Sequence, residues 1–229
     1  RFVGPTPDGA PSSYRPESVD SLEFGLKTSS PDGRLRVNVS VFDADYDDLQ
    51  IIVRESFNPL TVNAGAARVR GGELELQWLA SANWDIGFSA GHLDTKYRRL
   101  NQPAQDSGVR LDNKLANSPT WSVAAGTSYR LRLRSLGELT ARLDWAWQDT
   151  EYNDAVNSPQ IRQSAFHLVN ASLAFAPWES DWQVTVATRN LFNETYLVSG
   201  NSAFDTTAAY VEQVYGRPRE LLVSLAYEF

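Results

Sequence analysis

The chain has 229 residues, of which 42% are hydrophobic, so it is long enough for one large domain or two small ones with a sizeable core. Its 21 basic and 28 acidic residues give a formal net charge of -7, which argues against a nucleic-acid partner because phosphate contacts need clustered Lys and Arg. Cysteine is absent, which excludes disulfides and thiolate metal sites.

The chain starts with a segment that is typical of a loop. Residues 1–18 include FVGPTPDGAPSSYRPES, which is rich in Pro, Gly and Ser, and we expect them to be the remnant of an extracellular loop before a single β domain at 19–229. The sequence contains no Met, and no apolar run approaches the roughly 20 residues of a spanning helix. We therefore expect a fragment of a longer protein, in which any crossing of a membrane is made by strands.

Alternation of apolar and polar residues dominates the rest of the chain. Leu22, Phe24 and Leu26 alternate with polar residues, and the turn SPDGR leads into a second alternating run at 35–41, as in a β-hairpin. Further alternating runs lie at 73–78, 84–90, 121–129, 139–147, 169–175 and 182–188. The pattern predicts about nine strands, each with at least the roughly 9 to 11 residues that a tilted membrane strand requires.

The predicted connections are of two kinds. Short turns are expected at 30–34, 81–83, 134–138 and 176–181. Long connections are expected at 98–115, 150–163 and 199–213, with a short exception on the loop side at 55–61. Short connections at one end of the strands and long connections at the other are typical of an outer-membrane barrel. Aromatic residues beside both kinds of connection agree with an aromatic girdle at each membrane interface. A soluble β-sandwich with an aromatic core is the alternative.

The chain ends with the segment RELLVSLAYEF. Leu221, Val223, Leu225, Tyr227 and the terminal Phe229 fall on one parity, and the opposite parity carries Glu220, Ser224 and Glu228. An exposed apolar edge strand would invite pairing with another chain, whereas in an outer-membrane barrel this face meets lipid. We predict that the apolar parity faces lipid and the polar parity faces the barrel lumen.

A series of landmark segments runs through the chain: YRPESVDSLEFGLK (14–27), GRLRVNVSVFDADYDDLQ (33–50), NAGAARVRGGELELQW (63–78), LANSPTWSVAAGTSY (115–129), RNLFNETY (189–196) and YGRPRELLVSLAYEF (215–229). The most specific residues are Asn190, Leu191, Phe192, Asn193 and Tyr196, followed by Tyr215, Gly216, Pro218, Arg219 and the terminal Phe229. Together the segments resemble the carboxyl-terminal part of the barrel of a TonB-dependent outer-membrane receptor, over nearly the whole chain.

This resemblance implies an all-β, antiparallel transmembrane barrel of roughly 22 strands, of which the chain would hold about nine carboxyl-terminal strands without the amino-terminal plug. It also implies TonB-energised uptake of a scarce small-molecule ligand, with the TonB complex acting through the missing plug. A ferric siderophore is the commonest ligand of such receptors, and cobalamin, haem, saccharides and peptides are others. The last strand, residues Leu221, Val223, Leu225, Tyr227 and Phe229, would be the sorting signal read by the barrel assembly machinery.

Two other classes of function compete with the receptor. One is a passive porin or adhesin barrel in the outer membrane. The other is an outer-membrane hydrolase, but no Gly-x-Ser-x-Gly elbow links the available Ser, His and Asp residues. We therefore expect that the protein is not an enzyme and has no catalytic residues and no cofactor. We expect a monomer in the lipid of a bacterial outer membrane, without a nucleic-acid partner.

Two patterns could indicate a metal site. Asp43, Asp45, Asp47 and Asp48 resemble the start of a calcium loop, but Asp48 replaces the required glycine and the position of the bidentate Glu holds Arg54. We expect an acidic strand end at the outer rim instead. His92 and His167 lie in alternating runs without zinc-ligand spacing, so ordinary barrel positions are expected and no metal site is predicted.

The long loops are the expected place of ligand choice, above all 98–115 and 199–213. Tyr97, Arg98 and Arg99, at the base of one loop, are candidate ligand-binding residues because paired arginines could attract an anionic siderophore. Ordinary solvated charge is the alternative. Asn190 and Asn193 are expected to satisfy backbone groups where the strand ladder bends, which is an architectural role.

Overall fold

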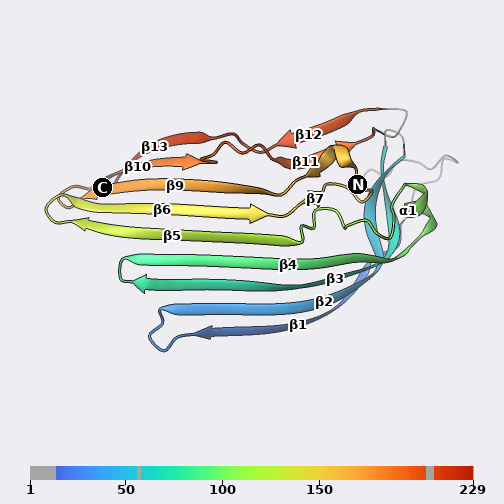
Figure 1. Cartoon of the computed structure of the whole chain (residues 1–229), viewed down its shortest axis with the longest axis horizontal. Helices are drawn as coiled ribbons and strands as arrows, with labels where there is room; N and C mark the ends of the chain where they lie inside the picture. Colours follow the sequence, from blue (N-terminus) through green and yellow to red (C-terminus); the bar gives the residue numbers. More distant parts are fainter. Residues whose placement is uncertain (1–13, 56–57, 205–208, 229) are drawn as a thin grey trace.

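A computed structural model of the chain describes residues 14–55, 58–204 and 209–228. Most of the expected loop remnant at 1–18, and the terminal Phe229, lie outside these ranges. Within the described residues the architecture is a curved antiparallel sheet in which each strand pairs with the next large strand along the chain (Figure 1). Its nine strands are β1 (Ser18–Ser29), β2 (Leu35–Glu55), β3 (Asn58–Ser81), β4 (Trp84–Leu100), β5 (Trp121–Leu133), β6 (Gly137–Gln148), β9 (Phe166–Pro177), β10 (Trp182–Arg189) and β13 (Glu220–Tyr227). The prediction of an all-β fold with about nine antiparallel strands is confirmed.

The connections differ in length at the two ends of the sheet, as predicted. Short turns join the strands at one end in Figure 1, and the longer connections gather at the other, which we call the loop end. The loop end carries the small elements α1 (Gln102–Asp106), β7 (Glu151–Tyr152), η1 (Pro159–Ile161), β8 (Arg162–Gln163), β11 (Leu197–Ser202) and β12 (Val211–Tyr215). Among the described residues no helix is long and apolar enough to cross a membrane, which carries no information about crossing by strands.

The β2–β3 hairpin is longer than the sequence indicated. β2 has 21 residues and β3 has 24, and Glu55 pairs with Asn58. The expected connection at 55–61 is therefore mostly strand. The alternating pattern did not reveal this extension because the pairing is interrupted by register shifts between Tyr46 and Gln50, after which the side-chain parity changes.

Cross-strand register places the predicted apolar parities on one continuous face of the sheet. One row across this apolar face contains Leu26, Val39, Leu74, Ala90, Val123, Trp147 and His167. The adjacent row on the opposite, polar face contains Gly25, Ser40, Glu73, Gly91, Ser122 and Gln148. Alternation along each strand thus becomes segregation across the whole sheet.

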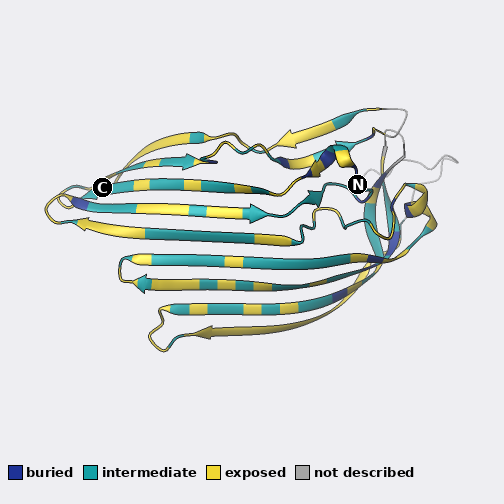
Figure 2. Ribbon diagram, in the orientation of Figure 1, coloured by how far each residue is buried: buried dark blue, intermediate teal, exposed yellow. Residues whose placement is uncertain are grey.

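The burial pattern is the reverse of that in a soluble sandwich. Phe24 is 67% exposed and Leu221 is 75% exposed, and the apolar face carries many other exposed Leu, Val and Trp side chains. The fully buried hydrophobic residues lie at the loop end, where Figure 2 shows most of the dark segments. A face of this size that is apolar yet uncovered is expected to contact lipid.

Candidate ligand-binding site at the loop end

The β2–β3 hairpin bends sharply where it leaves the main sheet. Asp48 has φ of 52° and Gly65, opposite the bend, has φ of 131°. A Cβ atom at position 65 would lie 2.2 Å from the carbonyl oxygen of Arg99, so glycine is required both for the backbone conformation and for the close approach of β4. Beyond this point the hairpin turns out of the direction of the neighbouring strands in Figure 1.

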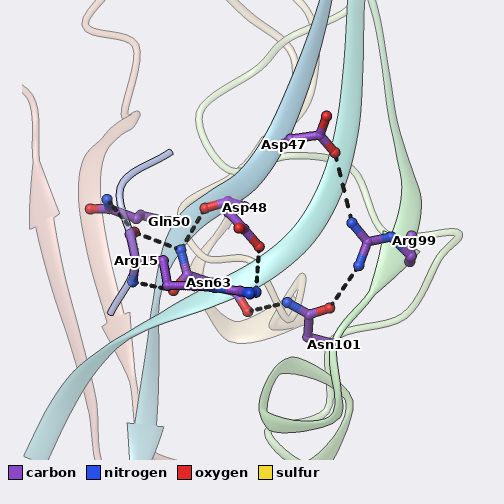
Figure 3. Close-up of polar contacts among 7 residues, drawn as sticks. All are labelled: Arg15, Asp47, Asp48, Gln50, Asn63, Arg99 and Asn101. Atoms are coloured by element: carbon purple, nitrogen blue, oxygen red, sulfur yellow. Dashed lines mark hydrogen bonds and ion pairs between the residues drawn. The ribbon is translucent and has the colours of Figure 1, made fainter. Parts of the chain in front are cut away.

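A network of polar side chains holds this bend (Figure 3). The Asn63 side-chain amide donates to the carbonyl oxygen of Asp48 at 2.6 Å and to that of Arg15 at 2.9 Å. Arg15 in turn donates from Nη2 to Asp48 Oδ1 at 2.7 Å and from its backbone N–H to Asn63 Oδ1 at 2.8 Å. Asn101 Nδ2 donates to the carbonyl oxygen of Asn63 at 3.3 Å, which connects the bend to the β4–β5 connection. The backbone groups exposed by the register shift are therefore satisfied by side chains.

An apolar cluster packs the loops against the bent hairpin. It contains the buried residues Val53, Ala64, Ala67, Tyr97, Ala104, Val109 and Ala155. These residues come from the hairpin, from β4, from α1 and the segment after it, and from the β6–β9 connection. Burial of their side chains fixes segments that are distant in the sequence relative to one another.

Next to this cluster lies a cavity of about 650 Å³, which we call the loop-end cavity. Its walls are residues 49–53 of β2, Tyr97, Ser107, residues 115–117, residues 153–156 with Ser158, and residues 200–204. Its lining includes apolar residues such as Ile51, Val53 and Phe204 and the amides Asn117, Asn153 and Asn201. A mainly apolar hollow with a few converging polar groups is the common form of a small-molecule site, so this cavity is the candidate ligand site.

The three predicted ligand residues lie on the same strand but in different surroundings, because Tyr97 is buried and the side chains of Arg98 and Arg99 are exposed. All three lie on β4, because its ladder continues to Leu100, and not in the loop. Tyr97 lies near the loop end of β4, beyond the roughly 10 strand residues that cross a bilayer. It is only 5% exposed, and burial together with the charge of Asp154 raises its pKa to about 12. Its phenol is therefore neutral and belongs to the apolar cluster, although its side chain also borders the loop-end cavity.

The paired arginines are compensated by carboxylates. Arg98 Nη1 lies 3.8 Å from Asp45 Oδ1, and Arg99 Nη2 lies 3.7 Å from Asp47 Oδ1. Arg99 also donates to Asn101 Oδ1 at 3.1 Å. These contacts favour a structural role, and binding of an anionic ligand by Arg98 and Arg99 stays a prediction.

The aspartate run lies inside β2, so the expectation of a strand end was wrong. Asp43 accepts a hydrogen bond from Arg68 Nε at 2.6 Å and one from Arg70 Nε at 3.0 Å. Asp45, Asp47 and Asp48 each have an arginine within 4.0 Å as well. Among the described residues no group of three or more His, Asp or Glu side chains could hold a metal ion. Cross-strand ion pairing accounts for this run.

Asn190 and Asn193 bind backbone groups at the end of β10. Asn190 is 6% exposed; its Nδ2 donates to the carbonyl oxygens of Glu194 and Arg217 at 2.8 and 3.1 Å, and its Oδ1 accepts from the Glu194 N–H at 2.8 Å. Asn193 Oδ1 accepts from the Arg219 N–H at 2.9 Å. Both asparagines have positive φ, of 49° and 56°, which suits this residue type. The contacts join the end of β10 to the segment that leads into β13.

The last strand has the predicted alternation. Leu221 and Val223 are 75% and 71% exposed and share the apolar face with Leu225 and Tyr227, while Ser224 pairs with Thr185 on the polar face. Leu222 is an apolar exception on the polar side. Among the described residues β13 pairs only with β10, so its other edge is unpaired within this part of the chain. The sorting role of this strand stays a prediction, and Phe229 lies outside the described residues.

The fold defines a class of protein. A curved antiparallel sheet with one exposed apolar face, short turns at one end and elaborate connections at the other is a segment of an outer-membrane β-barrel. A family model described as "TonB dependent receptor-like, beta-barrel" matches residues 2–191, and the chain belongs to this family. Its place is therefore the outer membrane of a Gram-negative bacterium.

Individual relatives agree with this assignment. The chain is 22% identical over 222 residues to the "Probable TonB-dependent siderophore receptor PiuA" of Acinetobacter baumannii, and the match covers 93% of the chain and 27% of PiuA. It is 24% identical over 226 residues to the ferripyoverdine receptor of Pseudomonas aeruginosa, a match that covers 93% of the chain and 25% of that protein. The chain thus spans about a quarter of the length of these curated relatives.

Solved structures show the same fold. The ferric yersiniabactin uptake receptor FyuA of Yersinia pestis superposes with a TM-score of 0.76 at 20% identity, over 93% of this chain and 30% of FyuA. The copper transporter OprC superposes with a TM-score of 0.66 at 19% identity, over 94% of this chain and 31% of OprC. Because proteins named for iron chelates and for copper both share the fold, the fold by itself does not determine the ligand.

Proposed function

We propose that the chain is the carboxyl-terminal part of a receptor that takes up a scarce ligand across the outer membrane with energy from the TonB complex, and that the ligand is a ferric siderophore. The observation that carries the proposal is the family match over residues 2–191, in a chain whose loop end forms a partly open cavity large enough for a small molecule. The two curated relatives described above are named as siderophore receptors, which supports iron uptake.

The partners follow from the same proposal. The TonB complex would act through an amino-terminal plug, the barrel assembly machinery would insert the chain, and the mature protein would be a monomer in outer-membrane lipid. No enzymatic activity is proposed. Among the described residues His92 and His167, the candidate bases, lie on barrel strands beside aromatic rings, with centroid distances of 4.5 Å to Trp121 and 6.4 Å to Phe192.

Energised uptake can be separated from passive diffusion in cells. The full-length gene would be expressed in a strain without other receptors for ferric chelates, and uptake of radiolabelled iron would be compared with and without a functional tonB gene. Uptake that disappears when tonB is deleted is expected. Uptake that persists without TonB would support the passive porin instead, and the absence of any iron uptake would overturn the ferric siderophore as the ligand.

A further inference from the structure

The loop-end cavity is poor in positive charge. Asp154 carries the only formal charge among its described lining residues, and it is negative. Gln50, Asn117, Asn153 and Asn201 line the same cavity with neutral amides. The side-chain nitrogens of Gln50, Asn153 and Asn201 each already donate one hydrogen bond, to Arg15 O, Ile161 O and Glu212 Oε2, and their amide oxygens are the acceptors that remain for a ligand. The described wall therefore contains no arginine or lysine to match an anionic ligand.

The Asp154 carboxylate keeps acceptor capacity for a ligand. Its Oδ1 accepts from the Ser158 N–H at 2.8 Å and its Oδ2 accepts from Ser158 Oγ at 2.5 Å. A carboxylate has about four acceptor sites, so two contacts with a single residue leave others open. Ser158 thus orients Asp154 without neutralising its charge.

Three cations on neighbouring described segments have partners of their own. Arg15 lies 2.7 Å from Asp48, Arg99 lies 3.7 Å from Asp47, and Lys114 donates to Thr120 Oγ1 at 2.9 Å. Arg110 and Arg162 lie on the same connections but are not lining residues. A second carboxylate stands close by, because Glu212 accepts from Asn201 Nδ2 at 3.3 Å. The described lining therefore presents one carboxylate and no cation, and a second carboxylate is bonded to a lining residue.

We propose that the loop-end cavity selects an uncharged or cationic metal chelate with an amide- or hydroxyl-rich periphery, and discriminates against strongly anionic chelates. This inference rests on the proposed uptake function and specifies the chemistry of the same site. An anionic chelate would meet Asp154 without a compensating cation in this wall, and like charges at close range in a partly desolvated site are costly. Apolar parts of the chelate would contact Ile51, Val53 and Phe204, and its amides would pair with the asparagines.

The test uses the complete receptor that contains this chain and three chelates of different charge. Binding of a cationic ferric trihydroxamate, a neutral ferric trihydroxamate and an anionic ferric triscatecholate would be measured on purified receptor. For the unmodified receptor the Kd of the cationic or neutral chelate is expected to be at least about tenfold below that of the anionic one. In Asp154→Asn the ratio of cationic to anionic Kd values is expected to shift by about tenfold toward the anionic chelate.

The matched control is Asp94→Asn, which removes a carboxylate that is paired with Lys96 at 3.2 Å and is not a lining residue. This control should leave the ratio of Kd values unchanged. Two results would overturn the charge assignment while TonB-dependent uptake still stands. One is that the unmodified receptor prefers the anionic chelate. The other is that Asp154→Asn weakens binding of all chelates alike and leaves the ratio of Kd values unchanged. If no chelate is bound and no TonB-dependent iron uptake occurs, the proposed function fails and this inference with it.

Discussion

The ring of Tyr196 covers Gly216 so closely that a Cβ atom at position 216 would lie 2.0 Å from its Cζ atom. The Gly216 N–H also donates to the carbonyl oxygen of Tyr196 at 2.8 Å. The Tyr196 ring also stacks on the Phe166 ring, with ring centroids 4.8 Å apart and an interplanar angle of 11°. This pair therefore connects the start of β9 with the segments that follow β10 and β12, which gives two of the signature residues a physical role.

Replacing Gly216 with Ala should destabilise the barrel by about 1–3 kcal/mol, because the ring must leave its stacked position to admit the methyl group. The matched control is Gly91→Ala on the polar face, where an added Cβ would meet nothing within 4 Å. Urea unfolding of the complete barrel in lipid vesicles measures both variants. Equal midpoints would show that the ring can move at no cost.

The two parities of β13 should differ in their tolerance of charge. We expect Val223→Arg to cost about 2–4 kcal/mol in the complete barrel, because the side chain would be placed in hydrocarbon, and Ser224→Arg to cost distinctly less. The same unfolding measurement in vesicles compares the two. Similar costs at both positions would refute the lipid and lumen assignment.

The bend in the β2–β3 hairpin should depend on Gly65. Gly65→Ala introduces both a positive-φ penalty and a contact with the Arg99 carbonyl oxygen, so the loop-end part of the hairpin should open more readily. Gly25→Ala is the control, because an added Cβ atom there would lie at an ordinary 3.8 Å from the Val39 carbonyl oxygen. Hydrogen exchange is expected to increase at residues 49–55 and 58–64 in Gly65→Ala alone, and unchanged protection there would argue against the role of this glycine.

Ligand preference should follow the long loops. Exchanging 98–115 and 199–213 in the complete receptor for the corresponding loops of a receptor with another ligand should change which compounds support growth, because loops on a rigid scaffold commonly hold binding residues. Growth on a panel of iron complexes, cobalamin and oligosaccharides is the measurement. Preference that instead followed an exchanged plug would contradict this prediction.

The terminal Phe229 should contribute to delivery of the chain to the outer membrane. Its deletion from the complete gene is expected to lower the fraction folded in the membrane, because the last strand is the edge that can pair with an assembly factor and an aromatic ring anchors well at the interface. The folded fraction is compared with periplasmic aggregates at low expression. Unchanged assembly would leave only a packing role for this residue.

Much of the architecture could be predicted from local pattern. The alternation of Leu221, Val223 and Leu225 with polar neighbours identified a strand between two different environments, because each successive side chain in a strand points to the opposite face. The unequal connections predicted which end of the sheet carries the elaborate segments. The nature of Asn190 and Asn193, which tolerate positive φ and bond to nearby backbone, indicated an architectural turn.

What the sequence alone determined was the face of each strand within the main sheet and the class of the fold, since both follow from residue order along a single strand. The tertiary structure decided the rest at the loop end. The register shift between Ala66 and Ala67 in the β3–β4 pairing separates the buried Tyr97 from Arg98, which contacts Asp45 on β2. Such contacts depend on cross-strand register and on the packing of distant loops, and no local period in the sequence encodes either of them.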